Sequence, residues 1–222
     1  WTDDIERLMS GRGALADQER ELAGVPARLT ATVGVGASLF ARLGLEAHRP
    51  PSLRPLPAFA TDRLDPRWGE ADLLLQVGAD DLLTVAHAVR VLTRDVRSIA
   101  TVRWTQRGFG RARGSVPSGE TPRNLLGQVD GTVNPQPGTE DFGRVVWATE
   151  GPAWWHGGTM LVVRRMRMDL DRWEKLGRLD RELVVGRRLA DGSPLTGGIE
   201  RYAVDLDAVD RDGLPVVPEA AH

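Results

Sequence analysis

Asp130 is the residue of this sequence that is best placed to do chemistry. It lies in the stretch Asn124-Leu-Leu-Gly-Gln-Val-Asp-Gly-Thr-Val-Asn-Pro135, between Gly127 and Gly131. Glycine adopts backbone conformations that other residues avoid, and it lets a chain run close to a flat ligand. A single Asp in a Gly-rich loop is most often a turn residue, so a ligand-facing role for Asp130 needs support from elsewhere. The histidine that ends the sequence, His222, is the second candidate.

Other familiar site motifs are absent from the sequence. Gly34-Val-Gly36 resembles the start of a dinucleotide-binding motif, but Leu39 takes the place of the third glycine and the surrounding pattern is that of a strand. There is no Gly-x-x-x-x-Gly-Lys phosphate loop and no Gly-x-Ser-x-Gly nucleophile elbow. The four histidines are too scattered for the spacing of a zinc site, and His87, in a helical pattern, is expected to be structural.

Composition and charge narrow the classes of function. The 222 residues are 41% hydrophobic, which is enough for a core, and no apolar run approaches the roughly 20 residues of a membrane span. A net charge of −2 does not favour a nucleic-acid surface, so neither nucleic acid nor a membrane span is expected. The absence of cysteine excludes disulfides, thiolate nucleophiles and zinc–thiolate sites. No signal peptide is visible, and a targeting segment could precede Trp1.

The first half of the chain shows the patterns of alternating helices and strands. Helical spacing of apolar residues and alternating β-branched runs are the signals that predict these elements. The predicted helices are 1–9, 15–22 and 80–95, and the predicted strands are 29–39, 71–77 and 98–109, with a Pro-rich loop over 49–66. This order matches a β-α-β-β-α-β unit without its first strand, so we expect a strand to precede Trp1.

The second half has the pattern of the beginning of another α+β unit. A connection over 110–142 is rich in Gly, Pro, Ser and Thr, and loops this long are usually functional or disordered. Beyond it we predict strands over 144–148 and 159–168, helices over 169–176 and 180–185, and an extended segment over 200–206. The expected organisation is an N-terminal ferredoxin-like domain at 1–112, a connecting loop at 113–143 that carries Asp130, and the start of a C-terminal ferredoxin-like domain at 144–222. The expected fold class is α+β.

Five segments occur in an order that resembles one known family. They are 104–109 (Trp-Thr-Gln-Arg-Gly-Phe), 124–135, 157–168 (Gly-Gly-Thr-Met-Leu-Val-Val-Arg-Arg-Met-Arg-Met), 185–188 (Val-Gly-Arg-Arg) and 218–222 (Pro-Glu-Ala-Ala-His). Together they resemble the dye-decolourising peroxidases, haem enzymes whose Gly-x-x-Asp-Gly element is present here as Gly127 to Gly131. The resemblance covers nearly the whole chain and is greatest to the bacterial exported subgroup.

The resemblance implies two ferredoxin-like domains of the dimeric α+β barrel type, with one haem b per chain held by the C-terminal one. It makes His222 the proximal iron ligand, because the family's proximal histidine follows a short Ala/Ser-containing stretch like Glu219-Ala-Ala. Neutral imidazole is also a good axial donor. Asp130 matches the family's distal acid and base. Arg187 is assigned to a haem propionate because guanidinium pairs well with carboxylate. The residues expected along the haem face are Gly131, Thr132 and Val133.

The activity implied by the resemblance is oxidation of phenolic and dye-like aromatic donors by hydrogen peroxide. Asp130 would take a proton from peroxide and return it to the leaving oxygen. The family's distal arginine lies beyond the proximal histidine, and hence beyond His222. Export from the cell is expected from the subgroup. One or two aromatic residues are expected to relay electrons to the surface, from the set Trp104, Trp147, Trp154, Trp155 and Tyr202.

Two other interpretations remain open. One is a haem-binding or porphyrin iron-releasing protein on the same fold, in which Asp130 serves porphyrin chemistry instead of peroxide cleavage. The other is a non-catalytic ferredoxin-like module without a cofactor. Replacement of Asp130 separates the first from a peroxidase, and a Soret band in the purified protein excludes the second.

Overall fold

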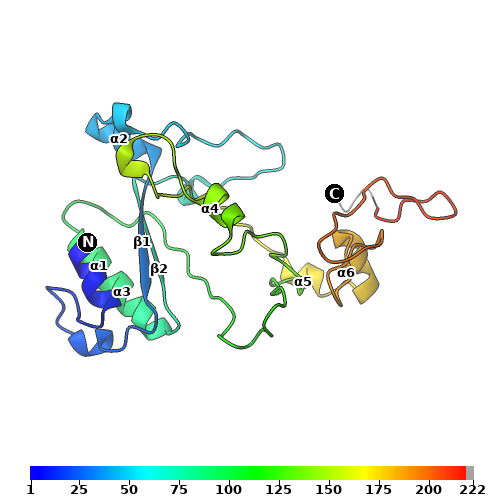
Figure 1. The fold of residues 1–222 in the computed structure, drawn as a ribbon, viewed down its shortest axis with the longest axis horizontal. Helices are drawn as coiled ribbons and strands as arrows, with labels where there is room; N and C mark the ends of the chain where they lie inside the picture. Colours follow the sequence, from blue (N-terminus) through cyan, green and yellow to red (C-terminus); the bar gives the residue numbers. More distant parts are fainter. Residues whose placement is uncertain (219–222) are drawn as a thin grey trace. The chain divides into compact units, whose positions relative to one another are not determined.

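The computed structural model describes residues 1–218, which form two units (Figure 1). The first unit consists of Trp1–Ala112 and Ala148–Gly158. The second consists of Arg113–Trp147 and Thr159–His222, of which residues 219–222 lie outside the described part. Within residues 1–218, no helix has both the length and the apolar character that crossing a bilayer requires.

The first unit contains an antiparallel pair of strands. β1 (Thr30–Val35) is paired along its whole length with β2 (Leu73–Gly78). Gly36 directly follows β1, and a Cβ at this position would lie 2.1 Å from the carbonyl oxygen of Ala71. Only glycine therefore lets the chain leave β1 at this close approach of the two backbones.

Helical segments make up most of the remaining regular structure of this unit (Figure 1). The longest of them, α3 (Leu82–Asp95), begins directly after its N-cap residue Asp81. The Asp81 carboxylate accepts a hydrogen bond from the Thr84 backbone N–H at 2.7 Å. The segments are α1 (Thr2–Met9), α2 (Ala37–Leu43) and α3 (Leu82–Asp95), with 3-10 turns at Arg20–Ala23, Glu46–His48, Pro66–Trp68 and Ala153–Trp155.

The core of the first unit is formed by the apolar face of α3 with residues of α1 and β2. Ala88, Val91 and Leu92 recur at helical spacing and are buried. Trp1 packs at the edge of this core and donates a hydrogen bond from Nε1 to the Leu92 carbonyl at 2.7 Å. The other buried members of the cluster are Leu8, Ala14, Ala23 and Leu29.

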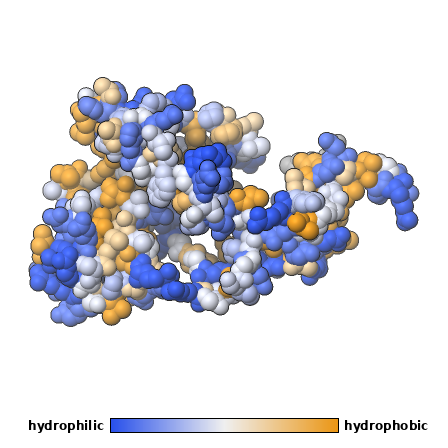
Figure 2. Space-filling view, in the orientation of Figure 1, coloured by the Kyte–Doolittle hydropathy of each residue, from blue (hydrophilic) through white to orange (hydrophobic). Residues whose placement is uncertain are grey.

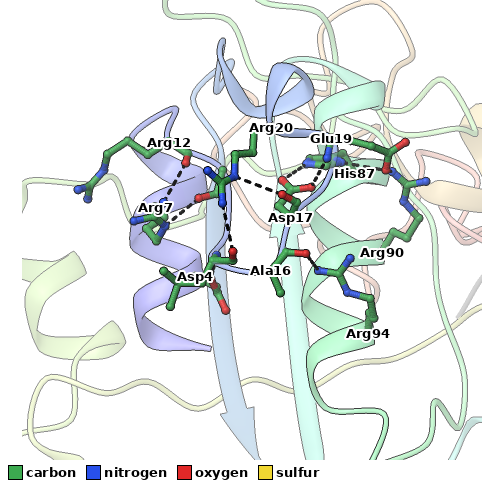
Figure 3. A network of polar contacts seen from close by, with 12 residues as sticks. Asp4, Arg7, Arg12, Ala16, Asp17, Glu19, Arg20, His87, Arg90 and Arg94 are labelled. Atoms are coloured by element: carbon green, nitrogen blue, oxygen red, sulfur yellow. Dashed lines mark hydrogen bonds and ion pairs between the residues drawn. The ribbon is translucent and has the colours of Figure 1, made fainter.

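A polar pair is buried beside this core (Figure 3). His87 Nε2 lies 2.9 Å from Asp17 Oδ2, and the two side chains are 2% and 1% exposed. Burial alone would raise the pKa of Asp17, but hydrogen bonds from the Glu19 backbone and from His87 hold it below its usual value. His87 is therefore a satisfied structural residue, as its position in a helical pattern predicted.

The second unit has short helices and long irregular segments. The helix α5 (Leu170–Trp173) contributes the buried Trp173. The Nε1 of Trp173 donates to the Leu126 carbonyl at 3.1 Å, and the Arg181 guanidinium lies over its ring at 5.6 Å from the centroid. Isolated β-bridges join residues 123 with 129, 187 with 194 and 209 with 215. The helices are α4 (Glu140–Val146), α5 (Leu170–Trp173) and α6 (Arg178–Val185).

Several predicted elements are confirmed. Together the helices and the sheet place the chain in the α+β class, as expected. The predictions for 1–9, 71–77, 80–95 and 180–185 match α1, β2, α3 and α6 closely, and the helix predicted over 169–176 is present as the shorter α5. The sheet described in residues 1–218 has two strands, so the complete β-α-β-β-α-β arrangement is not seen in this part of the chain.

Other predicted elements are wrong. The strand expected over 144–148 falls largely in α4, because Thr139 Oγ1 accepts from the Phe142 N–H and caps a helix there. The segments 98–109 and 159–168 have strand-like composition but no ladder partner in the described residues, so neither forms a strand. The strand expected over 29–39 ends at Val35 and gives way to α2, and the helix expected over 15–22 is only a 3-10 turn.

Apolar residues also lie at the surface, interspersed with polar ones (Figure 2). The segment 159–168 is an example, since its apolar residues are at least 39% exposed. The most exposed large apolar side chains include Val25, Leu64, Ile99, Phe109 and Val133.

Candidate functional site

The loop that carries Asp130 is closed by its own backbone. The Asp130 N–H donates to the Pro122 carbonyl at 2.9 Å, and the Asn124 N–H donates to the Gln128 carbonyl at 2.9 Å. The turn between them depends on Gly127, whose φ of +80° is in the left-handed region. Residues 122–130 therefore form a narrow hairpin-like loop with Asp130 at its end.

The Asp130 side chain is exposed at the end of this loop. Asn124 donates from Nδ2 to Asp130 Oδ2 at 3.2 Å. The other end of the Asn124 amide is used too, because Oδ1 accepts from the backbone N–H groups of Leu126 at 2.9 Å and Gln128 at 3.2 Å. Asn124 thus ties the direction of the carboxylate to the shape of the loop.

The three residues expected along the haem face follow directly. Gly131 has a φ of +110°, and a Cβ there would lie 3.2 Å from Asn134 Nδ2. Val133 leaves its side chain 81% exposed. Thr132 is turned differently, because its hydroxyl donates to the Glu200 carboxylate. Of these three residues, Val133 is therefore exposed, Gly131 is half-buried, and Thr132 is an internal link to Glu200.

Glu200 is a functional candidate that inspection of the sequence missed. Hydrogen bonds from the Thr121 and Thr132 hydroxyls lower the pKa of Glu200, assisted by the charges of Arg201 and Arg187 and opposed by desolvation. Glu200 is 68 residues from Thr132 along the chain, and no local motif marks the contact.

Arg187 lies in the same unit and binds the backbone. Its guanidinium donates to the carbonyls of Gly192 at 2.8 Å, Glu200 at 3.0 Å and Tyr202 at 2.8 Å. These bonds use three of the five N–H donors of the guanidinium. The predicted contact of Arg187 with a haem propionate stays a prediction, and such a contact would have to use the remaining donors.

Arg123 is a second arginine that sequence inspection missed. Its guanidinium donates to the carbonyl of Gly127 at 2.9 Å, within the Asp130 loop. It also donates to the carbonyls of Leu189 at 2.6 Å and Ala190 at 3.0 Å. Arg123 therefore joins the tip of the loop to the segment that follows α6.

The predicted iron ligand, His222, lies outside the described residues. Its position relative to Asp130 therefore stays a prediction.

The aromatic residues considered for electron relay fall in both units. In the first unit Trp154 is 51% exposed, its ring centroid lies 5.9 Å from those of Phe40 and Trp155, and its Nε1 donates to the His48 carbonyl at 3.0 Å. Trp104 pairs there with Trp68 at 6.2 Å. In the second unit the exposed members of the set are Trp147 and Tyr202.

Comparisons with known proteins identify relatives of both halves of the chain. The chain is 45% identical over 228 residues to a dye-decolorizing peroxidase of Thermobifida fusca, covering 100% of this chain and 53% of that protein. It is 36% identical to a deferrochelatase of Yersinia pseudotuberculosis, covering 89% of this chain and 46% of that protein. The chain therefore spans about half the length of these curated relatives.

A solved structure shares the fold. The structure of ferric DtpA from Streptomyces lividans superimposes with a TM-score of 0.86 at 46% identity, over 99% of this chain and 60% of that one. The N-terminal Dyp-type peroxidase domain matches residues 1–110, and the C-terminal Dyp-type peroxidase domain matches residues 121–222. Because these two matches cover nearly all of the chain, it belongs to the Dyp-type peroxidase family.

Proposed function

We propose that this chain forms the distal side, and through His222 the proximal ligand, of a haem b site at which hydrogen peroxide oxidises small aromatic donors. The observation that carries the proposal is the exposed carboxylate of Asp130 on a loop closed by backbone hydrogen bonds and steered by Asn124. A carboxylate held in one direction at a surface is suited to move a proton on a bound ligand. The 45% identity to a dye-decolorizing peroxidase supports the same function.

The described residues fit a flat group beside Asp130. Gly131 places no side chain next to the carboxylate, and Val133 holds an apolar side chain 81% exposed. Gln128, in the same loop, is buried, and its Nε2 has no hydrogen-bond partner among the described residues. A buried amide donor without an acceptor is costly, at about 1–3 kcal/mol. The exposed Val133 and the unsatisfied amide of Gln128 are both consistent with a bound group, such as haem, that would cover the one and accept from the other.

When bound, haem supplies the redox chemistry that consumes peroxide and oxidises the donor. The work of this chain is to hold and move protons. Asp130 would accept the proton of one peroxide oxygen and return it to the other peroxide oxygen, which would leave as water. Haem, held by this chain, would supply the two electrons for breaking the O–O bond and would take the remaining oxygen atom. Asn124, which belongs to the same loop, donates to Oδ2 and so holds the Asp130 carboxylate in one direction.

Replacement of Asp130 by Asn tests the proposal. The amide keeps the shape of the side chain but cannot accept the proton, so the rate at which the haem-loaded protein reacts with hydrogen peroxide should fall by about a hundredfold or more in stopped-flow. Asp171→Asn, at an exposed carboxylate of α5 in the same unit, is the matched control and should leave the rate unchanged. An Asp130→Asn protein that reacts at the normal rate would refute this role.

A second candidate function is release of iron from haem, favoured by the 36% identity to a deferrochelatase. In that case the same loop would hold porphyrin without any need for peroxide. Incubation of the protein with haem in the absence of peroxide, followed by the fluorescence of iron-free porphyrin, separates the two functions. Fluorescence that grows over several turnovers would favour iron release, and a stable Soret band would favour the peroxidase.

A further inference from the structure

Glu200 joins the two ends of the Asp130 loop. Thr132 donates from Oγ1 to Glu200 Oε1. Hydrogen bonding by the Thr121 side chain is the largest cause that lowers the pKa of the same carboxylate. Thr132 comes two residues after Asp130. Thr121 immediately precedes Pro122, whose carbonyl accepts the Asp130 N–H at 2.9 Å. One carboxylate therefore holds the chain on both sides of the point where Asp130 leaves the backbone.

The negative charge of Glu200 is part of this link. Bonds from Thr121 and Thr132 lower the pKa of Glu200, which means that both hydroxyls bind its ionised form preferentially. Hydrogen bonds from hydroxyls to a carboxylate are shorter and stronger than those between neutral groups. Removal of the charge should therefore loosen both threonines even when the shape of the side chain is kept.

Glu200 is itself fixed from the opposite side. Arg187 donates to the Glu200 carbonyl at 3.0 Å and to the Gly192 carbonyl at 2.8 Å. Gly192 is in turn packed against the residue before Asp130, because a Cβ on Gly192 would lie 2.9 Å from the Cβ of Val129. The segment 192–200 is thus a support on which the loop rests at Val129 and is bonded at Thr132.

We propose that Glu200 is a positioning residue for Asp130, which acts through Thr121 and Thr132 and not on the reacting atoms. The proposal rests on the function proposed above, in which Asp130 moves the proton. Its physical basis is that proton transfer depends steeply on placement, since a displacement of about 1 Å can cost about a hundredfold in rate.

The test compares variants that remove or keep the link in the haem-loaded protein. Glu200→Gln and Thr132→Val should each slow the reaction with hydrogen peroxide by about tenfold to a hundredfold. Thr132→Ser keeps the hydroxyl and should restore most of the rate. The double variant Glu200→Gln/Thr132→Val should react no more slowly than the slower of its two single variants, because both changes break the same hydrogen bond.

Glu182→Gln is the matched control. Glu182 is a carboxylate of the same unit that accepts from the Leu189 N–H at 2.9 Å and from Arg178 at 3.2 Å. Neither of these partners belongs to the Asp130 loop. Glu182→Gln should lower the thermal midpoint of unfolding without slowing the reaction with peroxide. If Glu182→Gln and Glu200→Gln slow the reaction equally, Glu200 is a structural residue only and the proposal is overturned.

A readout without turnover separates this proposal from the proposed function. Cyanide binding to the haem-loaded protein also requires a nearby group to accept the proton of HCN. The association rate of cyanide should therefore fall in Glu200→Gln. The rate in the double variant Asp130→Asn/Glu200→Gln should be no lower than that in Asp130→Asn. If Asp130→Asn alone slows both reactions while Glu200→Gln and Thr132→Val leave them unchanged, the positioning role fails and the proposed function stands. If Asp130→Asn has no effect, the proposed function fails.

Discussion

Asp17 in the first unit and Asp130 in the second are held in opposite ways. In the first unit Asp17 is 1% exposed and is paired with a histidine that is 2% exposed. In the second unit Asp130 is exposed, and the constraint lies in the loop around it. A buried carboxylate whose bonds are all used stabilises a fold, whereas an exposed carboxylate with a fixed backbone remains available to a ligand.

The difference extends to the groups around each carboxylate. Arg90 and Arg94 reach toward the Asp17–His87 pair from α3, and Arg94 donates to the Ala16 carbonyl at 3.0 Å (Figure 3). Around Asp130, the arginines bind carbonyls of the loop and of its support instead. The charge of Arg94 also helps to lower the pKa of Asp17, whereas the arginines near Asp130 bind backbone carbonyls.

The largest effect that would sharpen this comparison is expected at Asp17. Asp17→Ala leaves His87 buried without its partner, and breaking a buried pair in this way costs about 3–5 kcal/mol. Unfolding in urea, followed by circular dichroism, measures the loss. Asp3→Ala, at an exposed aspartate of α1, is the control and should cost less than about 1 kcal/mol. Equal losses in the two variants would break the distinction between buried and exposed carboxylates.

A smaller effect is expected from acid. The pKa of Asp17 in the folded protein is lowered, so the stability that this group contributes is present above its unfolded pKa and is lost as the pH falls through its folded pKa. The free energy of unfolding should therefore decline below about pH 4, near the usual pKa of aspartate. Asp17→Asn cannot titrate and should show a shallower decline between pH 4 and pH 2, measured by urea unfolding at each pH. Parallel declines in both proteins would rule out this contribution of Asp17.

The smallest effect is expected where an ion pair is exposed. Arg144 and Asp141, one turn apart in α4, pair with side chains that are 71% and 60% exposed. Arg144→Ala should change the free energy of unfolding by no more than about 0.5 kcal/mol. A loss as large as that in Asp17→Ala would show that pairing alone, and not burial, makes the first pair important.

Local signals explain which elements could be predicted from the sequence. α3 has an N-cap aspartate, Asp81, directly before it and an apolar face at helical spacing, so both signals are local. The segments 98–109 and 159–168 have strand composition, but a strand also needs a neighbour with which to pair, and composition does not report one. At 144–148 the adjacent valines favour a strand, but the helix there is set by its N-cap Thr139, which lies before this segment.

The same limit applies to the site. Asp130 is marked in the sequence by Gly127 and Gly131 close to it and by the order of the five segments that resemble the family. Glu200 was not found, because its partner Thr132 is 68 residues away and only the folded chain brings them together. Neighbouring residues thus mark the loop around Asp130 in the sequence, whereas its contact with Glu200 depends on the fold.

The most direct test replaces each of the two aspartates by Asn and measures both the reaction rate and the stability of each variant. Asp130→Asn should slow the reaction of the haem-loaded protein with hydrogen peroxide by about a hundredfold or more while leaving the urea midpoint unchanged. Asp17→Asn should lower the urea midpoint and leave the rate per folded molecule unchanged. If the two substitutions changed rate and stability in the same proportion, the claim that Asp130 serves chemistry and Asp17 serves the fold would be contradicted.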